Sequence, residues 1–596
     1  MRTASASSRP PLLLPRPRSV RFLDDLPAPP PDLLGRALSE PEARLGAAAP
    51  PRSEGYRIVV LPDRIEVRAR DAAGLFRARQ TLTQMDRLAR TGQAIPCLEI
   101  EDWPDFPVRG VMLDISRDKV PRMETLLGLT DRLAEWKINH LQLYMEHTFA
   151  YPRHPEVWAQ ASPMTGEEIE RLDGWCRERL IELVPNQNSF GHMERWLRHP
   201  RYRDLAEVTL LPEEESGAPA PAWRSLCPTD PRALDLIAGL YDDLLPHFSS
   251  RQLNVGLDET LDVGTGRSRD AVRTHGVGRV YLDFLLAVHR LVSERGRRMQ
   301  FWGDIVLSHP DLIRELPRDV IALDWGYEAD HPFELDGRRF AEAGIPHYVC
   351  PGTSAWLSLA GRAENAFGNL RSAAQAGLAH GAGGLLVTDW GDRGHWQPLP
   401  VSFPALAYGA ALAWCEPSNR DLDVPAALDA HAFFDAAGEA GRAAVALGKV
   451  YLETGVTIPN ASVLALLLLE PDLPLDRAPF DGLSIERLDA ARFAADRALS
   501  RIERARMARA DAELVVREWR LSAAMVGHAC SLGAARLRSG KGEIERIPSA
   551  DRRLLAEELD EVMTEYRSIW IERNRPGGLD DSVGRMERLG ARYRLD

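Results

Sequence analysis

Two adjacent carboxylates follow a short apolar run in the segment LNVGLDETLDVGTG, which starts at Leu253. Asp258 and Glu259 stand where this run, a predicted buried strand, ends. Neighbouring residues of a strand point to opposite sides, so one acid can face a pocket while the other contacts the residues around it. A carboxyl group held in this way can give or take a proton during a reaction. The pair is therefore our first catalytic candidate, and an acidic pair on the surface is the alternative.

Most of the other predicted strands also end in polar or aromatic residues. These residues are Asp114 and Arg117, Tyr144 and Glu146, Asn186 and Asn188, Trp302 and Asp304, Trp325 and Tyr327, and Trp390 and Asp392. An indole ring packs against the apolar face of a pyranose, and Arg and Asp side chains bind sugar hydroxyls with paired hydrogen bonds. Carboxylates that converge with three Trp residues therefore predict a sugar-binding site.

The strands that must position these residues number eight, and amphipathic helical segments separate most of them. The strands begin at Val108, His140, Ile181, Leu253, Met299, Val320, His347 and Gly384. Eight short strands with helical crossovers predict an α/β fold, a parallel sheet closed into a (β/α)8 TIM barrel, whose strand ends meet on one face and build the active site. An open, doubly wound sheet is the alternative.

The rest of the chain predicts further units around this barrel. We expect a disordered N-terminus over residues 1–15, a small α+β domain over 16–100, the catalytic barrel over 101–422 and a helical domain over 423–596. The runs YRIVV and IEVRA predict a hairpin in the α+β domain, with a further strand near Val20. Ala and Leu at helical spacing predict the helical domain, whose apolar face must pack on the barrel or on a second subunit.

Composition narrows the class of ligand. The 596 residues carry a formal net charge of −13, which argues against nucleic acid or an anionic membrane as the main partner. No run of about eighteen apolar residues occurs. The six cysteines are scattered without a CxxC pair, which indicates reduced thiols and neither a zinc site nor a disulfide framework. We therefore expect a cytoplasmic protein that binds a small or neutral ligand without metal or cofactor, with a homodimer as one option.

The sequence lacks the motifs of three common kinds of enzyme. The sequence contains no Gly-rich phosphate loop, no HExxH helix and no GxSxG nucleophile elbow. This argues against phosphoryl transfer, zinc-dependent hydrolysis and serine hydrolysis.

Three motifs taken together resemble the family 20 glycoside hydrolases. They are RGVMLDISR from Arg109, the strand that ends in Asp258-Glu259, and the last strand, which ends in Trp390-Gly-Asp392. The family consists of exo-acting β-N-acetylhexosaminidases, and the chain is most similar to the branch around hexosaminidase D. The resemblance covers the small N-terminal domain and the barrel.

The resemblance implies hydrolysis of a terminal β-linked N-acetylhexosamine, GlcNAc or GalNAc, with retention of configuration. In this family the 2-acetamido oxygen of the substrate attacks the anomeric carbon and forms an oxazoline, so no enzyme nucleophile is needed. By the resemblance, Asp258 stabilises the acetamido group and Glu259 acts as general acid and then as general base.

The resemblance also implies roles for residues around the pair. The implied substrate-binding residues are Arg117, Trp302, Trp325, Tyr327, Trp390 and Asp392, and the implied positioning residues are His192 and Glu146. Arg117 would bind the 3- and 4-hydroxyls, and Asp392 the 4- or 6-hydroxyl. His192 would orient Glu259, with Glu146 behind it. The Trp residues would wall the pocket, and Tyr327 is the candidate for bonding the acetamido oxygen.

Two other functions stay open at this stage. The first is a carbohydrate-binding relative with little turnover. The second is a conventional retaining β-glycosidase, in which Asp304 or Asp392 would be the nucleophile. Departures such as Asn254-Val-Gly-Leu before the acidic pair, where the family has His-x-Gly-Gly, leave the GlcNAc or GalNAc preference undecided.

The segment RNRPGGLDDS, which starts at Arg573, interrupts the helical pattern of the C-terminal region. A helix cap and exposed loop is one interpretation. The other is that Arg573 or Arg575 reaches the mouth of the barrel and complements the acids there.

Overall fold

The computed structural model describes residues 10–23, 26–30, 32–39, 43–45, 49–209, 225–540 and 542–594. Eight parallel strands form one sheet in the order β8-β7-β6-β13-β12-β11-β10-β9. They are β6 (Val108–Asp114), β7 (His140–Tyr144), β8 (Glu182–Val184), β9 (Gln252–Asn254), β10 (Arg298–Trp302), β11 (Ile321–Trp325), β12 (His347–Cys350) and β13 (Gly384–Asp389). Each of the eight predicted runs overlaps one of these strands, and β9 and β10 begin one residue before the predicted starts at Leu253 and Met299.

The sheet closes at the seam between β8 and β9. Asn186 and Asn254 form a parallel bridge there, supported by backbone hydrogen bonds of 2.9 Å from Asn254 N to Pro185 O and from Gln187 N to Asn254 O. The barrel predicted from the sequence is confirmed, and the open sheet is excluded.

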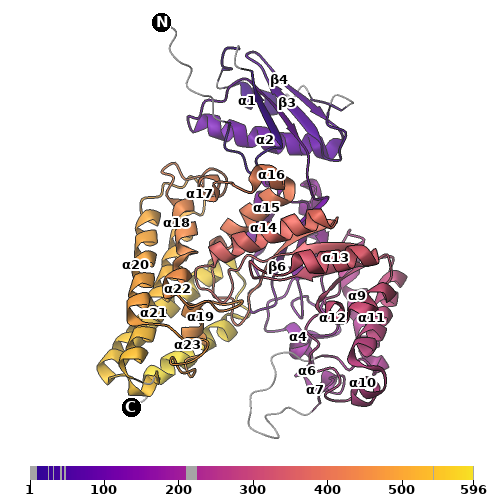
Figure 1. Cartoon of the computed structure of the whole chain (residues 1–596), viewed down its shortest axis with the longest axis vertical. Coiled ribbons are helices and arrows are strands. Elements are labelled where there is room, and N and C mark those ends of the chain that lie inside the picture. Colours follow the sequence, from indigo (N-terminus) through magenta and orange to yellow (C-terminus); the bar gives the residue numbers. More distant parts are fainter. Residues whose placement is uncertain are drawn as a thin grey trace.

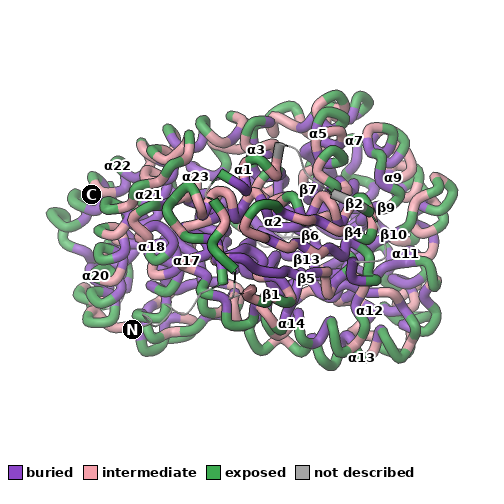
Figure 2. Tube along the Cα trace, turned by 90° about the horizontal axis from the view of Figure 1, so that it is seen from above, coloured by how far each residue is buried: buried purple, intermediate pink, exposed green. Residues whose placement is uncertain are grey.

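Helices cover the outside of the barrel (Figure 1). The longer ones are α3 (Met123–Glu135), α5 (Gly166–Glu178), α9 (Pro231–Leu244), α11 (Val277–Glu294), α13 (Phe333–Ala343), α14 (Ala363–Ala379) and α15 (Phe403–Trp414). The short helix α12 (Asp304–Ser308) follows β10 directly. Figure 2 shows that buried residues concentrate along the barrel strands and that exposed residues lie on the outer helices.

A five-stranded sheet precedes the barrel, in the order β1-β5-β3-β4-β2. It comprises β1 (Ser19–Phe22), β2 (Ala43–Leu45), β3 (Tyr56–Val60), β4 (Ile65–Ala69) and β5 (Leu98–Asp102), with helices α1 (Leu33–Ser39) and α2 (Ala72–Arg90). Strands β3 and β4 form the predicted antiparallel hairpin, and β1 is the strand expected near Val20. The Asp71 side chain caps α2 by accepting a hydrogen bond from Gly74 N.

Buried charges join this sheet domain to the barrel. Arg109, at the start of β6, donates from Nη2 to both carboxylate oxygens of Glu54 at 2.9 and 2.7 Å. Arg77 of α2 donates to the same carboxylate at 2.7 Å. Although burial alone would raise it, the two guanidinium groups lower the pKa of Glu54 to about 2.

The expected disordered N-terminus of residues 1–15 needs a correction. Residues 1–9 lie outside the described residues. Leu13 and Leu14, however, are buried, Leu13 in the core of the sheet domain and Leu14 in the main core. The backbone N–H of Leu14 donates to Gln84 Oε1 at 2.9 Å. Leu13 and Leu14 therefore pack in two different cores, because their burial removes apolar surface from water.

The C-terminal region is helical, as predicted. Its helices include α17 (Val424–Leu428), α18 (Ala440–Leu447), α19 (Val463–Leu469), α20 (Ile485–Ile502), α21 (Ala512–Arg538), α22 (Ser549–Arg573) and α23 (Leu579–Tyr593). Their apolar faces share one hydrophobic core with the barrel, so they pack on the barrel of their own chain. Within the described part of the chain, no helix combines the length and apolarity needed to cross a bilayer.

Candidate active site

The chain turns sharply after β9, and this turn presents the acidic pair. Gly256, Leu257 and Glu259 have backbone φ angles of +73°, +75° and +48°, which lie in the left-handed region. A Cβ atom on Gly256 would lie 1.7 Å from Oδ1 of Asn188, so only glycine fits against the loop that follows β8. Such a backbone is maintained by the packing around it and is common at functional sites.

His192 lies between the two catalytic candidates. Its Nε2 lies 3.2 Å from Oδ2 of Asp258 and 3.4 Å from Oε2 of Glu259. Its Nδ1 lies 3.9 Å from Oε1 of Glu146. Burial disfavours a charged imidazole, but the Asp258 and Glu259 carboxylates outweigh burial and raise the pKa of His192 well above its usual value. His192 is therefore a cation among carboxylates.

The Asp258 side chain is buried, and its two oxygens differ. Oδ2 faces His192. Oδ1 has no hydrogen-bond partner among the described residues. A buried carboxylate oxygen without a partner is costly, and a donor from a bound ligand would relieve that cost.

Arg117 lies beside His192, with its Nη2 3.5 Å from His192 Nδ1. Its Nη1 donates to Asp114 Oδ2 at 3.1 Å, and its Nε lies 3.2 Å from Glu146 Oε1. The guanidinium carbon lies 4.6 Å from the ring centre of Tyr144 and 5.0 Å from that of Trp390. Burial opposes its charge, but Tyr144 and the nearby carboxylates outweigh burial and raise the pKa of Arg117. The side chain is a fixed cation.

Asp392 belongs to the loop after β13. Asp114 anchors this loop, because its Oδ2 accepts a hydrogen bond of 3.0 Å from Gly391 N. Burial raises the pKa of Asp392 to about 6, with Arg117 opposing the shift and Asp114 and Glu259 adding to it.

Asp304, at the start of α12 just after β10, supports the acidic pair. Its Oδ2 accepts a hydrogen bond of 3.2 Å from Glu259 N, and its Oδ1 accepts one of 3.3 Å from Trp325 Nε1. Burial and the nearby Asp258 raise the pKa of Asp304 to about 7. Both oxygens thus hold neighbouring groups in place.

Four of the predicted aromatic residues pack together beside these charges. Trp390 Nε1 donates to Tyr327 Oη at 2.7 Å, and the Tyr327 ring stacks on Trp325 with centroids 5.2 Å apart. The Trp302 and Trp390 rings lie 6.0 Å apart. Trp302 Nε1 is buried and has no partner among the described residues. Trp356, which was not predicted, completes the group: its ring is nearly perpendicular to that of Tyr327, with centroids 5.0 Å apart.

A cavity that is open to solvent lies beside the charged residues of the site. Its lining includes the predicted site residues Arg117, Glu146, His192, Glu259 and Asp392. The other predicted residues contact this set directly or through one another. They are Asp258, Trp302, Trp325, Tyr327 and Trp390. The structure therefore brings all ten predicted site residues together at the carboxyl ends of the strands.

The cavity also contains residues that the sequence analysis missed. Glu194 lies two positions after His192, and burial beside Glu146 raises the pKa of Glu194 to about 7. Leu357 comes from the loop after β12. Asn460 and Arg585 come from the C-terminal region, and no local pattern connects them with the barrel.

The segment from Arg573 lies on the predicted face, but its arginines have other partners. Asn574 bridges Pro121 in the loop after β6, so the segment lies over the carboxyl ends of the strands. Arg573 pairs with Glu518 and Asp511, and Arg575 pairs with Glu168. Neither arginine lines the cavity, so the expectation that they complement its acids is wrong, and Arg585 of α23 has that position.

Outside this cavity, one group of side chains in the described ranges has the composition of a metal site. It consists of Asp324, His331 and Asp336. None of the three lines the cavity.

Several curated proteins that the chain resembles are named as hexosaminidases. A β-hexosaminidase of Akkermansia muciniphila is 25% identical over 290 residues, which cover 43% of this chain and 57% of that protein. A β-N-acetylhexosaminidase of Cellulomonas fimi is 24% identical over 448 residues, 68% of this chain and 82% of that protein. Hexosaminidase D of Homo sapiens is 24% identical over 354 residues, 54% of this chain and 68% of that protein. The chain thus spans little more than half of the Akkermansia protein.

Solved structures share the fold. A crystal structure of a β-N-acetylhexosaminidase has a TM-score of 0.57 at 17% identity, over 71% of this chain and 96% of that one. The chitobiase of Flavobacterium johnsoniae has a TM-score of 0.57 at 15% identity, over 94% and 99% of the two chains. Identities this low establish likeness of fold.

Two family models match the sequence in consecutive segments. The model described as glycosyl hydrolase family 20, domain 2, matches residues 28–103. The model of the family 20 catalytic domain matches residues 106–400. The two matches together span more than half of the chain, and the protein belongs to glycosyl hydrolase family 20.

Proposed function

We propose that the protein is an exo-acting β-N-acetylhexosaminidase that removes a terminal, non-reducing GlcNAc or GalNAc by substrate-assisted hydrolysis. The observation that carries this proposal is the Oδ1 of buried Asp258, which has no hydrogen-bond partner among the described residues and belongs to the residue before Glu259, which lines the cavity. An acetamido N–H is the donor that such an oxygen can accept. A C2 hydroxyl could donate to the same oxygen, but it has no carbonyl oxygen with which to attack the anomeric carbon.

In the first step, Asp258 accepts the acetamido N–H and stabilises the positive charge that develops on nitrogen. The acetamido oxygen attacks the anomeric carbon while Glu259 protonates the departing glycosidic oxygen. The products are an oxazoline and the free aglycone. His192 holds Asp258 in place through its contact with Oδ2.

In the second step, the Glu259 carboxylate takes a proton from water, and the resulting hydroxide opens the oxazoline at the anomeric carbon. Two inversions give net retention. Asp304 accepts from the Glu259 backbone N–H, so the acid keeps its position through both steps.

Arg117 and Asp392 are suited to bind the hydroxyls of the terminal sugar. A guanidinium donates to hydroxyl oxygens, and a carboxylate accepts from hydroxyl protons. Both side chains line the cavity, and they lie close enough for their charges to interact.

A conventional glycosidase mechanism needs a carboxylate nucleophile roughly 5 Å from the acid. Asp304 is poorly suited, because both of its oxygens already accept hydrogen bonds and its raised pKa disfavours the anion. Asp392 is the better candidate for that mechanism. A binding protein with little turnover would not require the backbone strain that places Glu259.

A panel of aryl β-glycosides of GlcNAc, GalNAc, Glc and Gal tests the proposal. We expect cleavage of the two 2-acetamido sugars only, with inhibition by a thiazoline that mimics the oxazoline. Equal rates on the plain glucoside would favour the carboxylate nucleophile. Binding of GlcNAc without cleavage of any glycoside would favour the binding protein.

We further propose a reducing, cytoplasmic location and keep the homodimer as a proposal. All six cysteines are free and buried, which suits a reducing compartment. Cell fractionation tests the location, and light scattering of the purified chain tests the homodimer. We expect no binding to nucleic acid or to anionic vesicles, given the charge of −13.

A further inference from the structure

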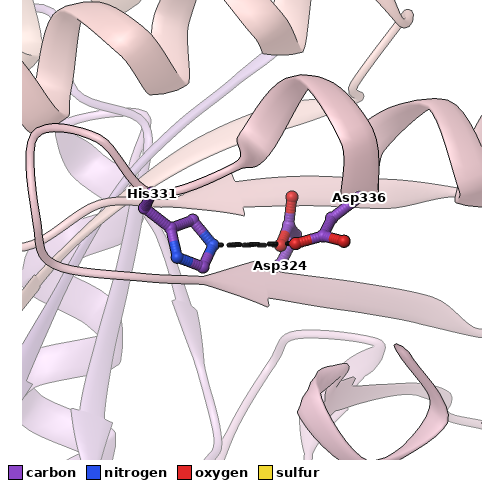
Figure 3. Close-up of side chains that lie close together, drawn as sticks. All are labelled: Asp324, His331 and Asp336. Atoms are coloured by element: carbon purple, nitrogen blue, oxygen red, sulfur yellow. Dashed lines mark ion pairs between the residues drawn. The ribbon is translucent and has the colours of Figure 1, made fainter. Parts of the chain in front are cut away.

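A histidine and two aspartates converge beside strand β11 (Figure 3), and none of the three lines the sugar cavity. Asp324 belongs to β11, Asp336 belongs to α13, and His331 lies in the connection between them. Leu323 and Trp325 belong to the aromatic cluster inside the barrel. Because side chains of a strand alternate, Asp324 points outward, toward the helix layer.

Several polar atoms that face one another in this group lack hydrogen-bond partners among the described residues. Asp324 is fully buried, and neither of its carboxylate oxygens has a hydrogen-bond partner within the described residues. His331 Nε2 is also buried without such a partner. It lies 3.9 Å from Asp324 Oδ1 and 3.9 Å from Asp336 Oδ2, beyond hydrogen-bond distance. Two carboxylates and an imidazole nitrogen therefore surround one common point.

We propose that Asp324, His331 and Asp336 form a binding site for a divalent transition metal ion, with Zn²⁺ as the best match. A buried carboxylate with two unpaired oxygens is costly, and a cation at the common point would satisfy it. Ligands about 2.1 Å from one ion lie roughly 3 to 4 Å from each other, so 3.9 Å needs only a small adjustment. Neither the family fold nor the hydrolytic mechanism proposed above depends on this ion.

The donor set selects the class of metal. Imidazole nitrogen suits zinc and the other first-row transition ions, whereas calcium and magnesium prefer an all-oxygen shell. Three protein ligands with water as the fourth would complete a tetrahedron. The His331 side chain is 23% exposed, which gives both the ion and the water a path from solvent.

The surroundings of the site fit a bound cation. The other oxygen of Asp336, Oδ1, pairs with Arg339 at 3.2 Å, so Oδ2 is left for the ion. The His331 ring lies against Gly326, where a Cβ atom would come within 2.1 Å of Nδ1. Glycine at this position therefore lets the imidazole turn its Nε2 toward the two aspartates.

A metal at this place would have a structural effect on the sugar site. The connection from Gly326 to Pro332 carries Tyr327, and Trp325 precedes it. An ion shared by Asp324, His331 and Asp336 would tie that connection to both β11 and α13. The expected role is to fix the aromatic wall, without contact with the substrate.

Metal binding to the untagged, full-length protein tests the proposal. After chelator treatment and dialysis, we expect titration calorimetry and elemental analysis to give about one Zn²⁺ per chain, with a rise in Tm on addition of Zn²⁺. Asp324→Asn and His331→Gln should each weaken Zn²⁺ binding on the order of 10- to 100-fold or more, since the loss of even an outer partner of a metal ligand has such an effect. Asp330→Asn is the matched control, because Asp330 is exposed in the same connection.

Cobalt gives a second readout that does not depend on stability. Co²⁺ in the site should produce the visible absorption of a four-coordinate ion, and His331→Gln should abolish it. Stoichiometric binding that both ligand variants retain would place the ion elsewhere and overturn the proposal. The absence of stoichiometric Zn²⁺ and Co²⁺ binding to the wild-type protein would also overturn the proposal. The three side chains would then interact only as charged groups, without a metal ion. Hexosaminidase activity is not part of the test, so this result is separable from the proposed function.

Discussion

His192 Nε2 lies 3.2 Å from Oδ2 of Asp258, while Oδ1 of the same carboxylate has no partner among the described residues. One oxygen thus faces the His192 imidazole, and the other is the one that the proposed mechanism assigns to the acetamido N–H. This asymmetry separates the role of Asp258 from that of its neighbour Glu259.

We expect the activity loss of Glu259→Gln to be larger for substrates with poor leaving groups. A glutamine cannot donate the proton that a poor leaving group needs, whereas a nitrophenolate leaves without it. The loss should be on the order of 10²- to 10⁴-fold on a disaccharide substrate and much smaller in the first step on a nitrophenyl glycoside. Single-turnover rates on both substrates measure the difference. Equal losses would mean that Glu259 is not the acid.

Asp258→Asn should slow both substrates together. The amide cannot stabilise the positive charge that develops on the acetamido nitrogen, a loss that is independent of the leaving group. We expect kcat to fall on the order of 10²- to 10³-fold with little change in KM, as for the removal of one electrostatic contact in a transition state. Unchanged kcat would assign the acetamido contact to another residue.

His192→Asn should lower the stability of the folded protein by an amount that depends on pH. Because the folded-state pKa of His192 is raised, its charged form stabilises the fold fully below the unfolded pKa of roughly 6.5. That contribution disappears as pH rises through the folded pKa. The difference in Tm between wild type and His192→Asn should therefore be largest in mild acid and shrink toward alkaline pH. A difference that grows with pH would contradict a charged His192.

The helix α23 should affect substrates that extend beyond the terminal sugar. Arg585 lines the cavity, and its partner Asp118 keeps a second partner in Arg195. We expect Arg585→Met to raise KM for oligosaccharides by about tenfold, or ~1.4 kcal/mol, with kcat unchanged. Arg588→Met, on the exposed side of the same helix, is the control. Equal KM values for the two variants would remove α23 from the binding surface.

Acid should weaken the contact between the sheet domain and the barrel. The folded pKa of Glu54, about 2, lies below its ordinary value of 4.5, so its contribution to stability is present above pH 4.5 and is lost as pH falls toward 2. Glu54→Gln leaves Arg109 and Arg77 buried without their anion and should cost roughly 3 kcal/mol at neutral pH. Urea unfolding at pH 7 and at pH 3 should reveal a smaller difference at the lower pH. An equal difference at both would contradict the depressed pKa.

The sequence was sufficient to predict the barrel, because its strands are continuous apolar runs that end in polar residues. Asp114, Glu146 and Asp392 could be assigned to one site since the carboxyl ends of barrel strands converge. The burial of Leu14 could not be predicted. The prolines and arginines around Leu14 are typical of a disordered segment. Leu14 is buried only because it packs against residues that are far from it in the sequence.

Other parts of the site depend on contacts that no local pattern records. Asp304 was considered as a nucleophile, but its hydrogen bonds with Glu259 N and Trp325 Nε1 give it a positioning role. Arg585 lies more than three hundred residues from Glu259 along the chain, and only the packing of α23 brings it to the cavity. The arginines of the 573–575 segment were wrongly assigned to the cavity because residue type alone does not identify a partner.

The seam of the barrel has a consequence for how the enzyme responds to its substrate. Strands β8 and β9 meet through a single bridge, Asn186 to Asn254, whereas neighbouring strands share full ladders. His192 follows one side of this seam and Asp258 follows the other. A sugar held by both loops would act as a cross-link over the least hydrogen-bonded line of the barrel. Amide exchange should therefore slow most at residues beside the seam when the oxazoline mimic binds, while the ladders on the far side of the barrel exchange as before.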